Sequence, residues 1–375
     1  MLEIKENNKK NINKEERETN IEILRIIAMC MITLHHFALY TGIIYGTEIS
    51  KKIIYGIFCL VLGKIGVGIF VLITGYFLID KKFSFKRLFK VWFQVFFYSV
   101  ELYIVFALLG KTEWMTIKDI IKIFMPITYN QYWFMTTYVY LILLTPLINK
   151  FVSSLDKEQF KRVLILLTIL LVIIPTIIYN NSMMSNINTL VTLIVFAYLY
   201  MIAGYIKKYE LSFLKGRKVI NILIFLIGYI LAVILEIVTK KLAIENPNYE
   251  GMFSYYRELN SLPIVLCYIS LFYIFKDMKM KNNKFINYIA KISLPVYLIQ
   301  DNNLFRMPLW KEIFYILETD GKIKIILTGI IAIIILYLIS VIIEFFRVQL
   351  LEKPIIKTKL FEKLSNKVDE IYNII

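Results

Sequence analysis

The sequence predicts an all-α integral membrane protein, a bundle of about ten transmembrane helices. Hydrophobic residues make up 58% of the 375 residues and charged residues only 19%, whereas a soluble domain has about 45–50% apolar and about 25% charged residues. The apolar residues form runs close to the ~20 residues that a spanning helix needs, separated by short Lys-rich and Asn-rich segments. A spanning backbone must satisfy its own hydrogen bonds, so we expect the runs to be helices.

The apolar runs define ten expected spans. In chain order they are residues 21–41, 55–79, 91–110, 132–149, 163–179, 188–206, 219–238, 260–275, 285–302 and 323–346. The first run has no small-residue cleavage site, so we expect a retained span and not a signal peptide. No repeat or linker interrupts the alternation. One membrane domain is therefore expected over 21–346, between a polar tail at 1–20 and a basic, amphipathic tail at 347–375.

The segments between the spans differ in charge. Those on the side of both termini carry 29 Lys and Arg residues and those on the other side carry 12, counting Lys324 at the start of the last span, while Arg25, Lys64 and Lys291 lie within spans. Because basic residues favour cytoplasmic loops, we expect both termini in the cytoplasm and the protein in the plasma membrane, surrounded by membrane lipids. The same bias explains the net charge of +16, so the composition gives no support to nucleic acid as a partner.

The two longest segments on the outer side, 239–259 and 303–322, contain aromatic and charged residues. An acceptor outside the cytoplasm could dock there. An interfacial aromatic belt explains the same residues equally well. They are Tyr249, Phe253, Tyr255, Tyr256, Arg257, Glu258, Arg306 and Trp310.

The chain has two histidines, His35 and His36, and both lie in the first span. Histidine is the obvious candidate for proton transfer near neutral pH. Arg25 precedes His36 by eleven residues, nearly three turns at ~3.6 residues per turn, so the two side chains are expected on one helix face about 16 Å apart, with His35 about 100° away. This face fits a long ligand with phosphates at one end and a reactive group at the other, as in an acyl-coenzyme A. Alternatively, Arg25 anchors at lipid headgroups and His36 is structural.

Other ionisable residues in or near the spans have less specific patterns. Glu22 lies one turn before Arg25, where it can form an ion pair or simply stabilise the start of the helix. Lys64 and Lys291 could contact a cofactor, but we rank pairing within the bundle ahead of that role, with Glu101, Glu236 and Glu344 as candidate partners for either lysine. The glycines of the second span allow close helix packing.

Several stretches together resemble a known family. They are Glu22-x-Leu24-Arg25 with ten residues between Arg25 and His36, the run FVLITGYF at 70–77 with the basic loop after it, QYWF at 131–134 with LLTPLIN at 143–149, and SLPVYLIQDN at 293–302. In this order, over residues 20 to about 346, they resemble the acyltransferase 3 family of membrane acyltransferases.

The resemblance implies a ten-helix enzyme that moves an acyl group, most often acetyl, from cytoplasmic acyl-coenzyme A to a hydroxyl of an envelope glycan, as an O-acetyltransferase. It makes His36 the catalytic residue, with Arg25 and Glu22 in the same motif. Arg25 and the basic loop would hold the donor, and other motif residues would contact substrate. The expected donor contacts are Arg25, Lys86, Arg87 and Lys90, and the expected substrate contacts are Thr74, Tyr76, Tyr132, Trp133 and Asp301.

The sequence departs from the family pattern at four positions. Thr74 stands in place of the usual Ser and Tyr76 in place of Phe, which keeps a hydroxyl and a ring. Lys90 replaces an Arg, which keeps the charge but loses bidentate geometry toward phosphate. Gln300 stands where relatives commonly have His, so we expect no second catalytic histidine there.

The expected mechanism is proton abstraction by His36 from the acceptor hydroxyl, since a low-dielectric site favours neutral imidazole. A route through an acylated His36 is equally compatible with the sequence. The alternative function is a transporter or flippase for lipid-linked glycans, and a scaffold of an envelope-synthesis complex is a third class. We expect no metal, because adjacent His35 and His36 diverge on a helix and no Cys/His cluster exists.

Overall fold

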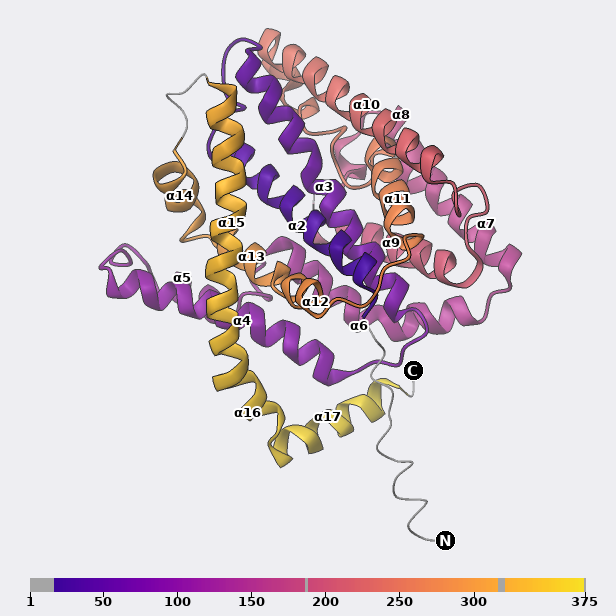
Figure 1. Cartoon of the computed structure of the whole chain (residues 1–375), viewed down its shortest axis with the longest axis vertical. Coiled ribbons are helices and arrows are strands. Elements are labelled where there is room, and N and C mark those ends of the chain that lie inside the picture. The colour runs from indigo at the N-terminus through magenta and orange to yellow at the C-terminus, as the bar shows by residue number, and fades with distance from the viewer. Residues whose placement is uncertain (1–16, 186–187, 316–320, 374–375) are drawn as a thin grey trace.

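The computed structural model describes residues 17–185, 188–315 and 321–373, and every regular element in these ranges is a helix. Figure 1 shows the helices gathered into one bundle. Eight helical segments are long and apolar enough to cross a bilayer, which confirms the predicted all-α membrane fold. They are α2 (Thr19–Tyr40), α3 (Lys51–Leu78), α4 (Phe85–Leu108), α6 (Trp133–Ser153), α7, η1 and α8 (Lys157–Thr168, Ile169–Ile173 and Ile174–Ile177), α9 (Thr189–Tyr209), α10 (Lys218–Glu245), and α15, η5 and α16 (Lys322–Phe346, Arg347–Glu352 and Lys353–Ile356).

The other two expected spans are shorter than expected. Residues 260–275 correspond to α11 (Leu262–Lys276), which has only 15 residues. Residues 285–302 form two helices of 8 residues each, α12 (Lys284–Lys291) and α13 (Ser293–Gln300). Pro295 explains the break, because its ring would clash with the carbonyl four residues earlier in a continuous helix. Proline is tolerated in a first turn, so a new helix begins at Ser293.

Contacts between the loops show which segments share a side of the bundle. The segments expected on the cytoplasmic side, or the span ends next to them, contact one another. The contacts are Lys208 with Asp80 at 3.1 Å, Asn149 with the Leu78 carbonyl at 2.9 Å, Lys276 with Glu210 at 2.8 Å, the Asn283 amide with Thr19 at 2.9 Å, and Phe83 stacked on Tyr372 at 4.4 Å. Residues 1–16 of the expected N-terminal tail and residues 316–320 of the second outer segment lie outside the described ranges.

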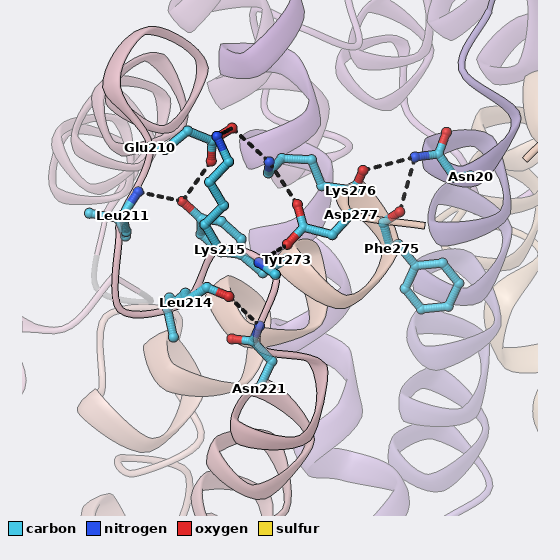
Figure 2. Close-up of polar contacts among 11 residues, drawn as sticks. Asn20, Glu210, Leu211, Leu214, Lys215, Asn221, Tyr273, Phe275, Lys276 and Asp277 are labelled. Atoms are coloured by element: carbon cyan, nitrogen blue, oxygen red, sulfur yellow. Dashed lines mark hydrogen bonds and ion pairs between the residues drawn. The ribbon is translucent and has the colours of Figure 1, made fainter. Parts of the chain in front are cut away.

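The start of α2 is fixed by a polar network at the ends of α9 and α11 (Figure 2). The Asn20 side chain donates to the carbonyls of Phe275 and Lys276 at 3.0 and 3.2 Å. The Lys276 ammonium in turn pairs with Glu210 at 2.8 Å and with Asp277 at 2.9 Å. The network therefore holds the first turn of α2 in place relative to two neighbouring helices.

Helices α2 and α3 pack closely because glycines face α2. A Cβ on Gly66 would lie 2.5 Å from the Ala28 carbonyl oxygen, and a Cβ on Gly63 would lie 2.4 Å from the His35 ring. Both distances are too short for any larger residue without movement of the neighbour. The close packing expected from the small residues of the second span is therefore present.

The C-terminal helix α17 (Lys359–Tyr372) packs against the start of α4. The Phe361 ring lies 4.8 Å from the Phe89 ring, and the Asp369 carboxylate accepts a hydrogen bond from the Phe85 amide at 2.5 Å. Apolar residues of this basic segment thus face the bundle. The remaining short elements are α5 (Ile117–Phe124), η2 (Asn181–Met183), η3 (Pro247–Met252), α14 (Arg306–Pro308) and η4 (Leu309–Ile313).

Candidate active site

A cavity of about 990 Å³ lies inside the bundle. Helices α2, α3, α4 and α6 line it, together with α13 and the segment after α15. We call the part lined by Arg25, Arg87, Lys90 and Arg347 the basic end, and the part lined by His35, His36 and Lys64 the histidine end. The volume is at the upper limit of the roughly 300–1,000 Å³ typical of small-molecule sites.

Arg25 and His36 both line this cavity, and α2 is one uninterrupted helix between them. Their separation of about 16 Å along the helix follows from the rise of about 1.5 Å per residue. The ion pair considered for Glu22 is present, because its carboxylate lies 3.2 Å from Arg25 Nε and 3.0 Å from Arg17. Glu22 also lines the cavity, so the pair fixes Arg25 at the basic end.

His36 is buried among aromatic rings. The ring centroids of Tyr40 and Tyr297 lie 5.4 and 6.2 Å from that of His36. Nδ1 of His36 has no hydrogen-bond partner among the described residues, and neither has Oε1 of the buried Gln300 side chain. An imidazole that lines a cavity and has a ring nitrogen without a protein partner is suited to act as a general base toward a bound hydroxyl.

His35 also touches the cavity, although we expected it to point away from the face of Arg25 and His36. Its Nδ1 lies 2.7 Å from the Leu60 carbonyl oxygen, and its ring fills the space over Gly63. An imidazole held between two helices in this way has a packing role that explains its presence without catalysis.

The predicted donor-binding residues separate into two groups. Arg87 and Lys90 line the basic end with Arg25. Lys86, which directly precedes Arg87, is exposed and does not line the cavity. One residue corresponds to about 100° of rotation in a helix, which explains the difference. Lys90 pairs with Glu352 at 3.4 Å. The basic end therefore contains acidic residues as well as basic ones.

Two of the predicted substrate-binding residues line the cavity, Thr74 and Trp133. The Thr74 hydroxyl donates to the Phe70 carbonyl at 2.8 Å and lies 3.3 Å from the Tyr138 hydroxyl. The Lys64 ammonium lies 4.5 Å from the centre of the Trp133 ring, within the range of a cation–π contact. An aromatic face beside a cation is thus available at the histidine end.

The other three predicted substrate-binding residues are placed outside the cavity lining. Tyr76 packs on Phe272 with ring centroids 5.5 Å apart. Tyr132 accepts a hydrogen bond from Asn302 at 2.7 Å, and Asp301 accepts one from Tyr40 at 2.9 Å. These side chains therefore have partners within the bundle, and substrate contact by them stays a prediction.

Sequence reasoning missed the partners of the charges inside the bundle. Lys64 pairs with Glu258 at 3.0 Å, and none of the three carboxylates that we considered for it is its partner. Glu236 pairs instead with Arg257. An unpaired charge in a span is costly, so the sequence does predict that Lys64 has a partner. Which carboxylate it is depends on helix packing across almost 200 residues of chain.

These features define a multi-pass helical membrane protein with a charged internal cavity and a buried histidine along one face of its first span. A comparison with protein families identifies it further: the model of the acyltransferase domain Acyl_transf_3 matches residues 18–345, so the chain belongs to the acyltransferase 3 family. The resemblance seen in the sequence is confirmed. No curated protein and no solved structure gives a match to the chain.

Proposed function

We propose that this acyltransferase moves an acyl group, most often acetyl, from acyl-coenzyme A to a hydroxyl of a cell-envelope carbohydrate, with His36 as general base. The observation that carries the proposal is that Arg25 and His36 line one cavity, about 16 Å apart along one helix, and that Nδ1 of His36 has no hydrogen-bond partner among the described residues. Family membership supports acyl transfer, and the cavity supports the choice of donor and base.

The cavity suits an extended donor with its phosphates at the basic end. Arg25, Arg87 and Lys90 supply cations there, and charge-assisted contacts to phosphate are among the stronger hydrogen bonds. The chain between phosphates and thioester would follow α2 toward His36, past apolar residues such as Met29 and Ile32, which also line the cavity. The thioester would then lie at the histidine end, about 16 Å from Arg25.

In the proposed reaction His36 accepts the proton of the acceptor hydroxyl as its oxygen attacks the thioester carbonyl carbon. A new C–O bond forms, the C–S bond breaks, and the proton passes from the imidazolium to the departing sulfur. Lys64, at the same end of the cavity, places positive charge near the developing oxyanion. A two-step route through an acylated His36 uses the same residues.

A carbohydrate acceptor fits the aromatic surface at the histidine end, where Trp133 lines the cavity beside Lys64 and Glu258. Ring faces and charged hydrogen-bonding groups together suit a polyhydroxylated ligand. With the orientation predicted from charge, the histidine end lies toward the outside of the plasma membrane and the basic end toward the cytoplasm. The donor would therefore enter the basic end from the cytoplasm.

Mass spectrometry of envelope polysaccharides from cells with and without this protein tests the proposal. We expect ester-linked acyl groups on a glycan only in cells that make the active protein, and none in cells that make His36→Ala at a matched level. A transporter or flippase would instead change the amount or location of a glycan without changing its acylation. Unchanged acylation would therefore contradict acyl transfer to an envelope carbohydrate.

A further inference from the structure

A buried charge cluster of Glu344, Arg347 and Glu352, in the last membrane helix, lines the basic end of the cavity. Arg347 is 3% exposed, and its Nε and Nη2 each donate to the Glu344 carboxylate at 2.8 Å. Its Nη2 also donates to Glu352 at 2.6 Å. Gln94 of α4 donates to Glu344 at 2.8 Å, which joins the two helices. The expected span ended at residue 346, but the helical segment continues to Ile356 and includes these groups.

A π-helical segment, Arg347–Glu352, creates this cluster. Residues five apart in an α-helix point about 140° away from one another. Hydrogen bonds from i to i+5 in a π segment bring such residues to the same side, and single π turns are frequent at functional sites. The π turn therefore brings the Glu352 carboxylate close enough to pair with Arg347.

Two features of this cluster make it suitable for binding an anion. Nη1 of Arg347 is buried and has no hydrogen-bond partner in the part of the chain that the structure describes. A buried donor without a partner is unfavourable. In addition, Glu352 is shared by two cations, Arg347 and Lys90, and all three residues line the cavity. One carboxylate thus stands where two cations of the basic end converge.

We propose that Arg347 is a phosphate-binding residue of this cavity and that Glu352 is the counter-ion with which the phosphate competes. A phosphate at this position gains the unused Arg347 donor and the Lys90 charge. The same chemistry could come from the donor or from a lipid headgroup at the membrane boundary. Binding of coenzyme A by Arg347 rests on the proposed function, whereas binding of a headgroup does not.

The test measures binding in lipid nanodiscs with Arg347→Lys and Glu352→Gln. Arg347→Lys keeps a charge but loses the planar guanidinium and its spare donor. One arm titrates coenzyme A in zwitterionic nanodiscs, and the other measures the gain in Tm from phosphatidylglycerol without coenzyme A. Lys353→Ala is the control, because it removes an exposed charge from the same helix without touching the cavity. Size-exclusion profiles check that each variant is folded.

If the donor phosphate binds Arg347, Arg347→Lys weakens coenzyme A binding by about ten- to a hundredfold. Glu352→Gln has the opposite effect and tightens it, because a competing anion is removed. A purely structural cluster would give weaker or unchanged binding with Glu352→Gln, so this variant decides the question even if Arg347→Lys folds poorly.

The two arms separate the possible failures. If Arg347→Lys lowers only the gain in Tm from phosphatidylglycerol, the phosphate belongs to a lipid headgroup. If wild type does not bind coenzyme A, the proposed donor is wrong, and the lipid arm alone decides the role of Arg347. Unchanged results for both variants in both arms would overturn the inference.

Discussion

At the scale of single residues, the two histidines differ in what holds them. His36 lines the cavity, and its Nδ1 has no hydrogen-bond partner among the described residues, while the Nδ1 of His35 contacts the Leu60 carbonyl oxygen and its ring packs over Gly63. Adjacent residues on one helix therefore have different chemistry available. This difference follows from the direction of each ring relative to α3 and the cavity.

We expect His36→Ala to lower acyl transfer by at least about 10²–10⁴-fold, the usual contribution of a general base. His35→Asn should keep substantial activity, because its amide can still bond the Leu60 carbonyl. Glycan acylation per amount of membrane-inserted protein is the measurement, with both variants expressed at matched levels. Wild-type transfer by the His36 variant would remove this residue from the mechanism.

The cations of the basic end should act on binding more than on chemistry. Arg25→Ala and Arg87→Ala each remove a possible charge-assisted contact, at roughly 1.5–3 kcal/mol, so coenzyme A affinity should fall by about ten- to a hundredfold. The rate at saturating donor should change less. Lys86→Ala is the matched control from the first turn of α4, next to Arg87, because Lys86 is exposed and outside the cavity.

Binding isotherms and turnover measured separately on the same membrane preparations test this expectation. If both arginine variants bind coenzyme A like the Lys86 variant, the basic end is not the donor site. Arg25 would then be a headgroup anchor, the alternative that the sequence left open.

At the scale of helices, patterns along the chain predicted the elements that depend on local chemistry. Apolar runs predicted the long spans. The eleven-residue spacing predicted that Arg25 and His36 share one face of the helix, and both residues line the same cavity. The break in the ninth span was missed, although Pro295 was a visible signal for it. The π turn at Arg347–Glu352 had no such signal, because it depends on buried charge pairs that form only when helices pack.

Close packing of α2 on α3 gives a prediction about glycines. Gly66→Ala should lower the midpoint of unfolding and reduce activity, because the new Cβ would meet a backbone oxygen of Ala28 that cannot move aside. Overpacking of this kind costs about 1–3 kcal/mol. Thermal unfolding in detergent, followed together with acyl transfer, is the measurement.

Gly329→Ala is a matched control for this change. Gly329 also faces α2 from a membrane helix, but its new Cβ would lie 3.2 Å from a methyl group of the flexible Leu34 side chain. That side chain can adjust, so we expect a much smaller effect. Equal destabilisation by both substitutions would show that close approach of α2 and α3 is not the determining factor.

At the scale of the whole molecule, eight helical segments of the described residues are long enough to span a bilayer, and the contacts of the two shorter expected spans are compatible with ten passes. Helix α11 follows residues 255–260 in the chain and ends at the network of Lys276 and Glu210 (Figure 2). Residues 283–301 begin beside Thr19 and end beside Tyr40, at the two opposite ends of α2. These contacts agree with the grouping of the segments that the alternation of charge predicted. The pairs that close the bundle, such as Lys64 with Glu258, depend on packing and not on local sequence.

The grouping of segments leads to a prediction of orientation. Because Lys and Arg residues gather on the side of Asp80, Lys276 and Tyr372, we expect this side in the cytoplasm. Single cysteines at the exposed positions Lys82 and Lys311 test both sides, in a background where Cys30, Cys59 and Cys267 are replaced. On intact cells a membrane-impermeant thiol reagent should label Lys311→Cys and leave Lys82→Cys unlabelled.

Permeabilised cells provide the control, because both cysteines should then react, which shows that each site is accessible. The outcome bears directly on the direction of acyl flow. With the basic end facing the cytoplasm, cytoplasmic acyl-coenzyme A can reach Arg25, Arg87 and Lys90, and the acceptor meets His36 from outside. Labelling of Lys82→Cys on intact cells would show that the bundle has the opposite orientation. The basic end would then face the outside, where a cytoplasmic donor could not reach it.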